Sequence, residues 1–203
     1  MGSDVRLRHA SCEARAAPSS ARIISTLDDK MRPVFDTPRL FLRQASSEDA
    51  SFILELLNEP SYIDNIGDRG VRAAVDAINY VEEKYVASYA CHGFGLYLVE
   101  LKEASCPIGI CGLVKRDTLD CPDLGFAFLQ RFWSRGFATE AASATLDYAR
   151  CKLKLRCVYG VVAPKNARSI RLLERLGFRH VRSMKVPGQE LETNLYEAEL
   201  KPA

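Results

Sequence analysis

The segment RFWSRGFATEA, around Gly136, has the residue types of an anion-binding turn. Gly136 follows the apolar run DLGFAFL and precedes apolar residues at helical spacing, so a strand gives way to a helix there. The first turn of a helix leaves backbone N–H groups without partners, and the helix dipole attracts anions to that end. We therefore expect a phosphate to bind at the amides of Arg135, Gly136, Phe137 and Ala138.

The side chains around this glycine favour the same interpretation. Arg131 and Arg135 flank the turn with positive charge, and Thr139 places a hydroxyl in the first helical turn. A plain tight turn between packed elements is the alternative, because one Gly-x-Ala pattern is a weak signal. Glu140 lies in the first turn of the expected helix, where its negative charge interacts favourably with the helix dipole.

The elements that position this turn begin at about Pro33. Residues 1–33 are polar and rich in Ser, Ala and Arg, and we expect a flexible arm there. From residue 34 to 203 the patterns predict the order β-α-α-β-β-β-α-β-α-β-β. One helix is expected to end at Pro60, and a polar loop, SYIDNIGDRG, to follow it. The next helix is expected to bury Val71, Val75, Ile78, Val81 and Tyr85. This order predicts an α/β (α+β) domain with helices on a mixed sheet.

The overall composition excludes several classes of protein. The net charge of +2 is too small for a typical nucleic-acid binder, and no apolar stretch is long enough to span a bilayer. The seven cysteines form no C-x-x-C pair, so we expect free thiols rather than a metal site or a disulfide framework. Together with the absence of a secretory signal, this favours a cytoplasmic protein.

Three motifs in order resemble the GCN5-related N-acetyltransferase (GNAT) superfamily: DTPRLFLRQASSEDASFILELLNEP, RFWSRGFATEA and NARSIRLLERLGF. The likeness is greatest to its ribosomal-protein alanine N-acetyltransferase (RimJ/RimL-like) branch. It implies a GNAT fold, with about seven strands in a mostly antiparallel sheet and helices on both faces. It also implies acetyl-CoA as the co-substrate, no metal, and direct transfer of an acetyl group to a primary amine.

The resemblance assigns the cofactor site residue by residue. Gly136 and Ala138 match the small positions of the family's phosphate loop, and Trp133 replaces its Arg or Gln. The loop set is Arg131, Trp133, Ser134, Arg135, Gly136, Phe137, Ala138 and Thr139. The main chain of Phe126, Ala127, Phe128 and Leu129 would bind the pantetheine arm and polarise the thioester carbonyl. Asn166 and Ser169 would reach the cofactor from the last helix, where Asn166 is equally suited to be a plain cap.

The catalytic groups are less sharply indicated. The family's usual tyrosine acid falls at Leu173, so Ser169 is the candidate to protonate the departing thiolate. Asp123 and Glu190, with Glu192 beside it, are candidate general bases, each also explicable as a surface carboxylate. Tyr62 and Asp64, together with Tyr196, are candidate acceptor-binding residues, although loop solvation and core packing explain them as well. Cys121 and Cys157 are the only conceivable nucleophiles near the central strands. The sequence indicates no basic residue beside them that would convert either thiol to a thiolate.

Three functions stay open on these residues. The acceptor is either a protein N-terminus or a small-molecule amine. The absence of the usual tyrosine leaves a non-catalytic CoA-binding domain, used for sensing or assembly, as the alternative. We expect acetyl-CoA and an amine as the partners, and a monomer or homodimer.

Overall fold

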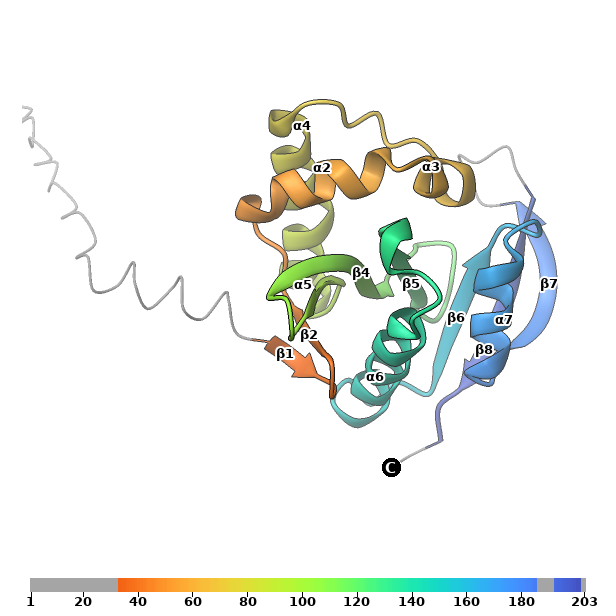
Figure 1. Ribbon diagram of the computed structural model, residues 1–203. Helices are drawn as coiled ribbons and strands as arrows, with labels where there is room; N and C mark the ends of the chain where they lie inside the picture. Colours follow the sequence, from red (N-terminus) through yellow and green to blue (C-terminus); the bar gives the residue numbers. More distant parts are fainter. Residues whose placement is uncertain (1–32, 186–191, 202–203) are drawn as a thin grey trace, which may run out of the picture.

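A single eight-stranded sheet runs through the molecule in the order β1-β2-β3-β4-β5-β6-β8-β7 (Figure 1). The computed structural model describes residues 33–185 and 192–201. The strands are β1 (Pro33–Asp36), β2 (Leu40–Arg43), β3 (Leu96–Leu101), β4 (Cys106–Val114), β5 (Asp123–Phe128), β6 (Cys157–Val162), β7 (Arg179–Lys185) and β8 (Glu192–Glu199). Only β5 and β6 are parallel among these neighbours. The prediction of a mixed, mostly antiparallel sheet is confirmed, with β1 as one more strand than the sequence indicated.

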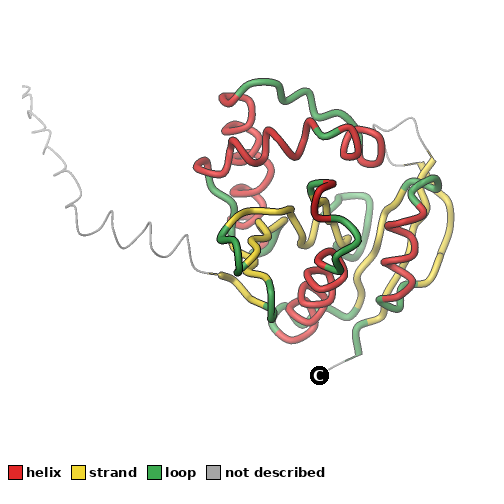
Figure 2. The backbone as a smooth tube through the Cα atoms, viewed as in Figure 1, coloured by secondary structure: helices red, strands yellow, loops and turns green. Residues whose placement is uncertain are grey.

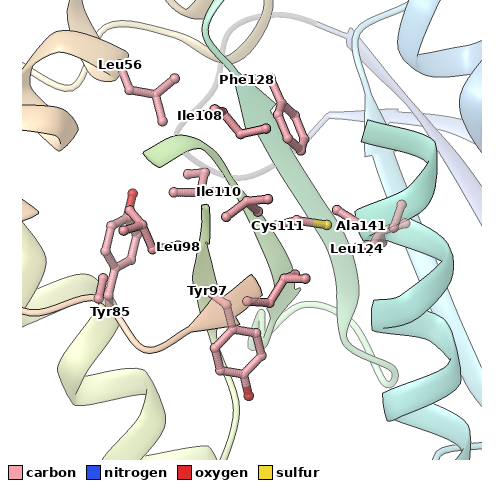
Figure 3. Packing of buried hydrophobic residues seen from close by; sticks show 14 of the residues in the cluster. Leu56, Tyr85, Tyr97, Leu98, Ile108, Ile110, Cys111, Leu124, Phe128 and Ala141 are labelled. Atoms are coloured by element: carbon pink, nitrogen blue, oxygen red, sulfur yellow. The ribbon is translucent and has the colours of Figure 1, made fainter. Parts of the chain in front are cut away.

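Helices cover both faces of this sheet (Figures 1 and 2). They are α2 (Ala50–Asn58), α3 (Pro60–Ile66), α4 (Ala74–Tyr80), α5 (Ala87–His92), α6 (Phe137–Cys151) and α7 (Ala167–Arg175). On β4 the side chains alternate between the faces, as a strand requires. Cys111 faces α6, where its Sγ lies 3.5 Å from Thr145 Oγ1. Ile110 points to the other face, towards Leu56 and Tyr85 (Figure 3). None of the helices described has the length and apolar character needed to cross a membrane.

The segment after α2 is helical, which corrects the prediction of a loop after Pro60. Proline lacks an N–H and has a fixed φ, so it is well suited to the first position of a helix. Pro60 takes that position in α3, and Glu59 is extended between the two helices with ψ 134°. The proline therefore ends α2 and begins α3, and it places Tyr62 on a buried helical face.

The second helical region also differs from its predicted pattern. Between α4 and α5 the chain forms a π-helical segment, Val81–Val86. Val81 and Tyr85 are buried as expected, but Val75 and Ile78 are 60% and 39% exposed. The helix begins only at Ala74, so Val71 lies before it, and the inward face carries Ala77 and then Val81. A helical period counted from Val71 therefore selects the wrong inward residues in α4.

Two predictions concern the ends and the cysteines of the chain. The expected arm lies outside the described residues, except for Pro33, which opens β1. The prediction of free thiols is wrong for one pair, since Cys121 and Cys157 form a disulfide with Cα atoms 6.0 Å apart. Both residues lie where β5 and β6 begin side by side, and sequence spacing carries no information about that proximity.

Candidate functional site

The two parallel strands at the centre of the sheet separate soon after they begin. β5 pairs with β4 along its whole length, from Asp123 to Phe128. Its ladder with β6 has a single pair, Asp123 with Tyr159. Beyond that pair the edge of β5 that faces β6 has no ladder partner within the described chain. The main chain of Phe126 and Ala127 is therefore available to bind an extended polar ligand.

The loop that follows β5 has a strained backbone. Ser134 has φ 61°, and Gly136 has φ 82° at the N-cap of α6. The left-handed region costs about 1–2 kcal/mol for residues other than glycine, so a glycine is suited to position 136. The first intrahelical bond runs from Glu140 N to Gly136 O, at 3.0 Å. The N–H groups of Phe137, Ala138 and Thr139 therefore have no intrahelical partner.

Trp133 fixes this loop from inside. Its indole Nε1 donates a hydrogen bond to the carbonyl oxygen of Phe128 at 2.7 Å. The Arg168 guanidinium of α7 lies over the indole ring, 4.8 Å from its centroid. These contacts, together with the packing of its ring against the core, hold Trp133 beneath the loop.

Arg39 fixes the loop from outside, and no sequence pattern around it had indicated this role. Its Nη1 donates to the Arg135 carbonyl oxygen at 3.1 Å, and its Nε donates to Glu140 Oε2 at 2.6 Å. Thr37 Oγ1 also donates to the Glu140 carboxylate, at 2.6 Å. Burial alone would raise the pKa of Glu140, but these hydrogen bonds outweigh it and lower the pKa. Glu140 thus joins α6 to the β1–β2 turn, rather than acting only on the helix dipole.

The N-terminus of α7 lies on the other side of the opening. Asn166 caps the helix, because its Oδ1 accepts a hydrogen bond from the Ser169 N–H at 3.1 Å. This confirms the cap role, and it leaves the Ser169 hydroxyl free for a ligand. Leu173 is buried, and it lies so close to Gly160 of β6 that a Cβ there would be 2.8 Å from Leu173 Cδ1. Glycine at position 160 therefore allows α7 to pack closely on β6.

These elements line an open cavity of about 1800 Å³. It brings together most of the residues predicted to form the site: Tyr62, Asp123, Phe126, Ala127, Phe128, Trp133, Ser134, Gly136, Phe137, Ala138, Thr139, Asn166 and Ser169. The cavity therefore extends from the α6 and α7 N-termini, along β5, to the helices before β3. In the part of the chain that the structure describes, no cluster of His, Cys, Asp or Glu has the composition of a metal site.

Other predicted residues do not line this cavity. Arg131 pairs with Glu55 at 2.5 Å, and Arg135 stacks its guanidinium 4.9 Å from the centroid of the Phe137 ring. Leu129 is buried in the core, and Tyr196 is buried against His180. Asp64 is exposed outside the cavity, and Glu190 lies outside the described residues. The positive charges of Arg131 and Arg135 thus lie on the outer surface of the loop and not in the cavity.

Asp123 lies in the cavity wall but is already engaged. Its carboxylate accepts hydrogen bonds from Arg116 Nε at 2.6 Å and Nη2 at 3.2 Å, and the residue is 2% exposed. Burial raises the pKa of Asp123, and the Arg116 guanidinium only partly opposes this shift. Its main structural role is to begin β5 beside β6, and its use as a base stays a prediction.

The end of the cavity near α3 and α4 contains a group of tyrosines, of which the sequence indicated only Tyr62. Tyr80 and Tyr85 pack edge to face, with ring centroids 5.6 Å apart. Burial raises the pKa of Tyr80 to about 12, and it raises the pKa of Tyr85 well above the usual value. Both hydroxyls are therefore protonated donors at neutral pH. Arg69 lies beside Tyr62 in the same wall.

Comparison with known proteins agrees with this geometry. Residues 39–179 match the model of the acetyltransferase (GNAT) domain family. The uncharacterized N-acetyltransferase p20 of Bacillus licheniformis is 29% identical over 147 residues, which cover 70% of this chain and 80% of that protein.

Solved structures show the same fold. An acetyltransferase from Agrobacterium tumefaciens superposes with a TM-score of 0.69 at 23% identity, covering 82% of this chain and 94% of that one. The spermidine N-acetyltransferase of Vibrio cholerae, solved with CoA and spermine, gives 0.67 at 20% identity, covering 81% and 97%. Since the family model spans more than half of the sequence, the chain belongs to the acetyltransferase (GNAT) domain family.

Proposed function

We propose that this chain is an acetyl-CoA-dependent N-acetyltransferase that moves an acetyl group directly to a primary amine. The observation that carries the proposal is the separation of β5 from β6 beside a loop with left-handed residues and the N-terminus of a fifteen-residue helix. A strand edge suits the amide groups of a pantetheine arm, and a helix N-terminus suits a pyrophosphate. The family membership supports the same cofactor.

In this proposal the residues divide the work between them. The amides of Phe137, Ala138 and Thr139 hold the pyrophosphate, while the main chain of β5 orients the thioester. The amine nitrogen attacks the thioester carbonyl carbon, the C–S bond breaks, and the Ser169 hydroxyl gives its proton to the departing thiolate. Asp123 and Glu190 remain the candidates to accept the proton from the ammonium group.

Two features support direct transfer rather than a covalent acetyl-enzyme. Cys121 and Cys157, which lie where β5 and β6 begin, are joined to each other. Burial raises the pKa of Cys111 to about 12, so its thiol is a poor nucleophile at neutral pH. A ternary complex of enzyme, acetyl-CoA and amine is therefore the proposed reacting species. The ribosomal-protein branch and a cytoplasmic location stay predictions, as does the choice between monomer and homodimer.

Calorimetric titration of the full chain with acetyl-CoA, CoA and dephospho-CoA tests the cofactor. We expect saturable binding of acetyl-CoA and CoA, and weaker binding of dephospho-CoA. Release of thiol that requires an added amine then tests the reaction. Binding without amine-dependent release would favour the sensor or assembly alternative, and no binding would contradict the proposal as a whole.

A further inference from the structure

The acceptor end of the cavity contains a buried polar group that the fold itself leaves unsatisfied. The Tyr85 hydroxyl has no hydrogen-bond partner within the described part of the chain, and the residue is 2% exposed. A buried hydroxyl without a partner typically costs 1–3 kcal/mol, so its presence calls for an explanation. Tyr85 lines the cavity, and its ring is directed from its helix towards the strands that carry Leu98 and Ile110 (Figure 3).

This position is next to the proposed path of the thioester. Ile110 pairs with Ala127 in the β4–β5 ladder, so both side chains lie on the face of the sheet that Tyr85 covers. Ala127 belongs to the part of β5 that separates from β6. A molecule bound at Tyr85 therefore lies on the acceptor side of the strand, opposite the face covered by α6.

The π-helical segment brings a second hydroxyl to the same place. A π-helical turn closes between residues i and i+5, so Tyr80 and Tyr85 share one face of the helix there. In a regular α-helix the same two residues would point in different directions. Tyr62 from α3 and Arg69 from the following loop complete the group, and both influence the Tyr80 and Tyr85 hydroxyls electrostatically.

The donors in this wall suit an anionic ligand. Arg69 contributes a permanent positive charge, and the tyrosine hydroxyls are donors. Asp68 also lines this end, but its carboxylate pairs with Arg72 at 2.5 Å. Glu83 and Lys84 are exposed side chains of opposite charge in the same lining. The guanidinium of Arg69 and the tyrosine hydroxyls are therefore the groups at this end that can bind an anionic oxygen.

We propose, on the basis of the acetyltransferase function above, that Arg69, Tyr80 and Tyr85 form the acceptor subsite and select a primary amine that also carries an anionic oxygen group. A carboxylate and a phosphate share this chemistry, because both accept hydrogen bonds from hydroxyls and pair with a guanidinium. The ligand then supplies the partner that the Tyr85 hydroxyl lacks.

The test compares each anionic amine with its uncharged counterpart. The probes are L-methionine and L-methioninamide, β-alanine and β-alaninamide, and O-phosphoethanolamine and ethanolamine, with spermidine as the cationic probe. We measure thiol release and, in the presence of CoA, equilibrium binding. We expect kcat/KM for at least one anionic amine to exceed that of its uncharged counterpart about tenfold or more, which identifies a carboxylate or a phosphate. Preference for spermidine, or no preference for the anion, overturns the inference.

Two conservative variants test the named residues. Arg69→Gln is expected to abolish the preference for the anion without changing the KM for acetyl-CoA, whereas Arg182→Gln, at an exposed position of β7 outside the cavity, should keep it. Tyr85→Phe removes only the unsatisfied hydroxyl, so the ligand-free protein should become more stable while the KM for the anionic amine rises about tenfold. Tyr159→Phe, outside the cavity, is the matched control. A more stable Tyr85→Phe protein with an unchanged acceptor KM overturns the assignment.

Failure of this inference and failure of the proposed function give different results. If acetyl-CoA does not bind in the calorimeter, the cofactor assignment is wrong and the acceptor subsite falls with it. If acetyl-CoA binds and an uncharged or cationic amine reacts but no anionic amine does, only the acceptor subsite is wrong. If acetyl-CoA binds and no amine of any kind reacts, the transfer reaction is wrong as well.

Discussion

The indole Nε1 of Trp133 donates a hydrogen bond to the carbonyl oxygen of Phe128, which is the last residue of β5. This bond, 2.7 Å long, ties the turn before α6 to the strand that leads into it. The strand edge and the helix N-terminus are therefore held in a fixed relation, as is needed when one extended ligand must contact both.

Removal of this bond should loosen the loop. Trp133→Phe keeps an aromatic ring but loses the donor, and we expect it to lower the free energy of unfolding by about 1 kcal/mol. We also expect the Kd for acetyl-CoA to rise severalfold, as measured by calorimetry. Phe94→Leu changes a half-buried ring that does not line the cavity, and is the control. An unchanged Kd in Trp133→Phe would show that the loop does not depend on this bond.

Gly136→Glu should abolish binding of the cofactor. The glycine has φ 82°, and a Cβ there would lie 3.3 Å from Arg39 Nη2, so the substitution strains the turn and places a carboxylate at the anion site. We expect the affinity for acetyl-CoA to fall at least about 100-fold, or roughly 2.7 kcal/mol. Trp133 is the single tryptophan of the chain, so its fluorescence is a second measure of binding.

Gly177→Glu separates backbone strain from loss of the anion site. Gly177 also has a positive φ, 87°, with open space around it, and it does not line the cavity. This variant should lose stability to a similar degree but keep its affinity. Equal loss of affinity in both variants would count against a phosphate at Gly136.

Ser169→Ala should lower turnover and spare the cofactor. The Asn166 cap uses the backbone N–H of Ser169, so the start of α7 is kept when the hydroxyl is removed. We expect kcat to fall about 100-fold, in the range of general acid catalysis, with an unchanged Kd for acetyl-CoA. Ser183→Ala, on β7 away from the cavity, should have full activity. If kcat does not change, the thiolate obtains its proton from another donor.

Glu140→Gln should weaken the connection between α6 and the β1–β2 turn. Its carboxylate accepts hydrogen bonds from Thr37 and Arg39, and we expect a loss of about 1–2 kcal/mol at pH 7 by chemical denaturation. Because the folded pKa of Glu140 is lowered, the stabilisation is complete above the unfolded pKa, about 4.3, and is lost as the pH falls through the folded pKa. The difference between wild type and variant should therefore shrink below about pH 4.

The matched control for this helix is Asp147→Asn. Asp147 also pairs with an arginine, Arg150, but its side chain is 64% exposed, so its removal should cost no more than about 0.5 kcal/mol. A difference between wild type and Glu140→Gln that is independent of pH would mean that the carboxylate charge is not what stabilises the turn.

The parts of the site that the sequence predicted are those with local causes. Gly136 lies between a strand pattern and a helix pattern, and Asn166 lies three residues before the amide that it caps. The chemistry of each is contained within one short segment. This is why the turn and the cap of α7 could be predicted without knowing the rest of the fold.

The parts that were missed depend on residues far apart in the sequence. Arg39 and Glu140 are separated by 101 positions, and nothing in either segment indicates the other. The same holds for Cys121 and Cys157, which meet only because two strand starts are neighbours. Pro60 was misread for a different reason, since proline ends one helix and begins another equally well.

The π-helical segment lets the acceptor end of the cavity keep its two tyrosines together with one more residue between them. Tyr80 and Tyr85 meet because one turn of Val81–Val86 holds an extra residue. Deletion of a single exposed residue, such as Glu82, would allow a regular α-helix in which the two tyrosines are four positions apart and still share a face. A relative that lacks this residue can therefore present the same pair of hydroxyls from an ordinary helix. A sequence alignment that allows no gap in this helix would miss that equivalence.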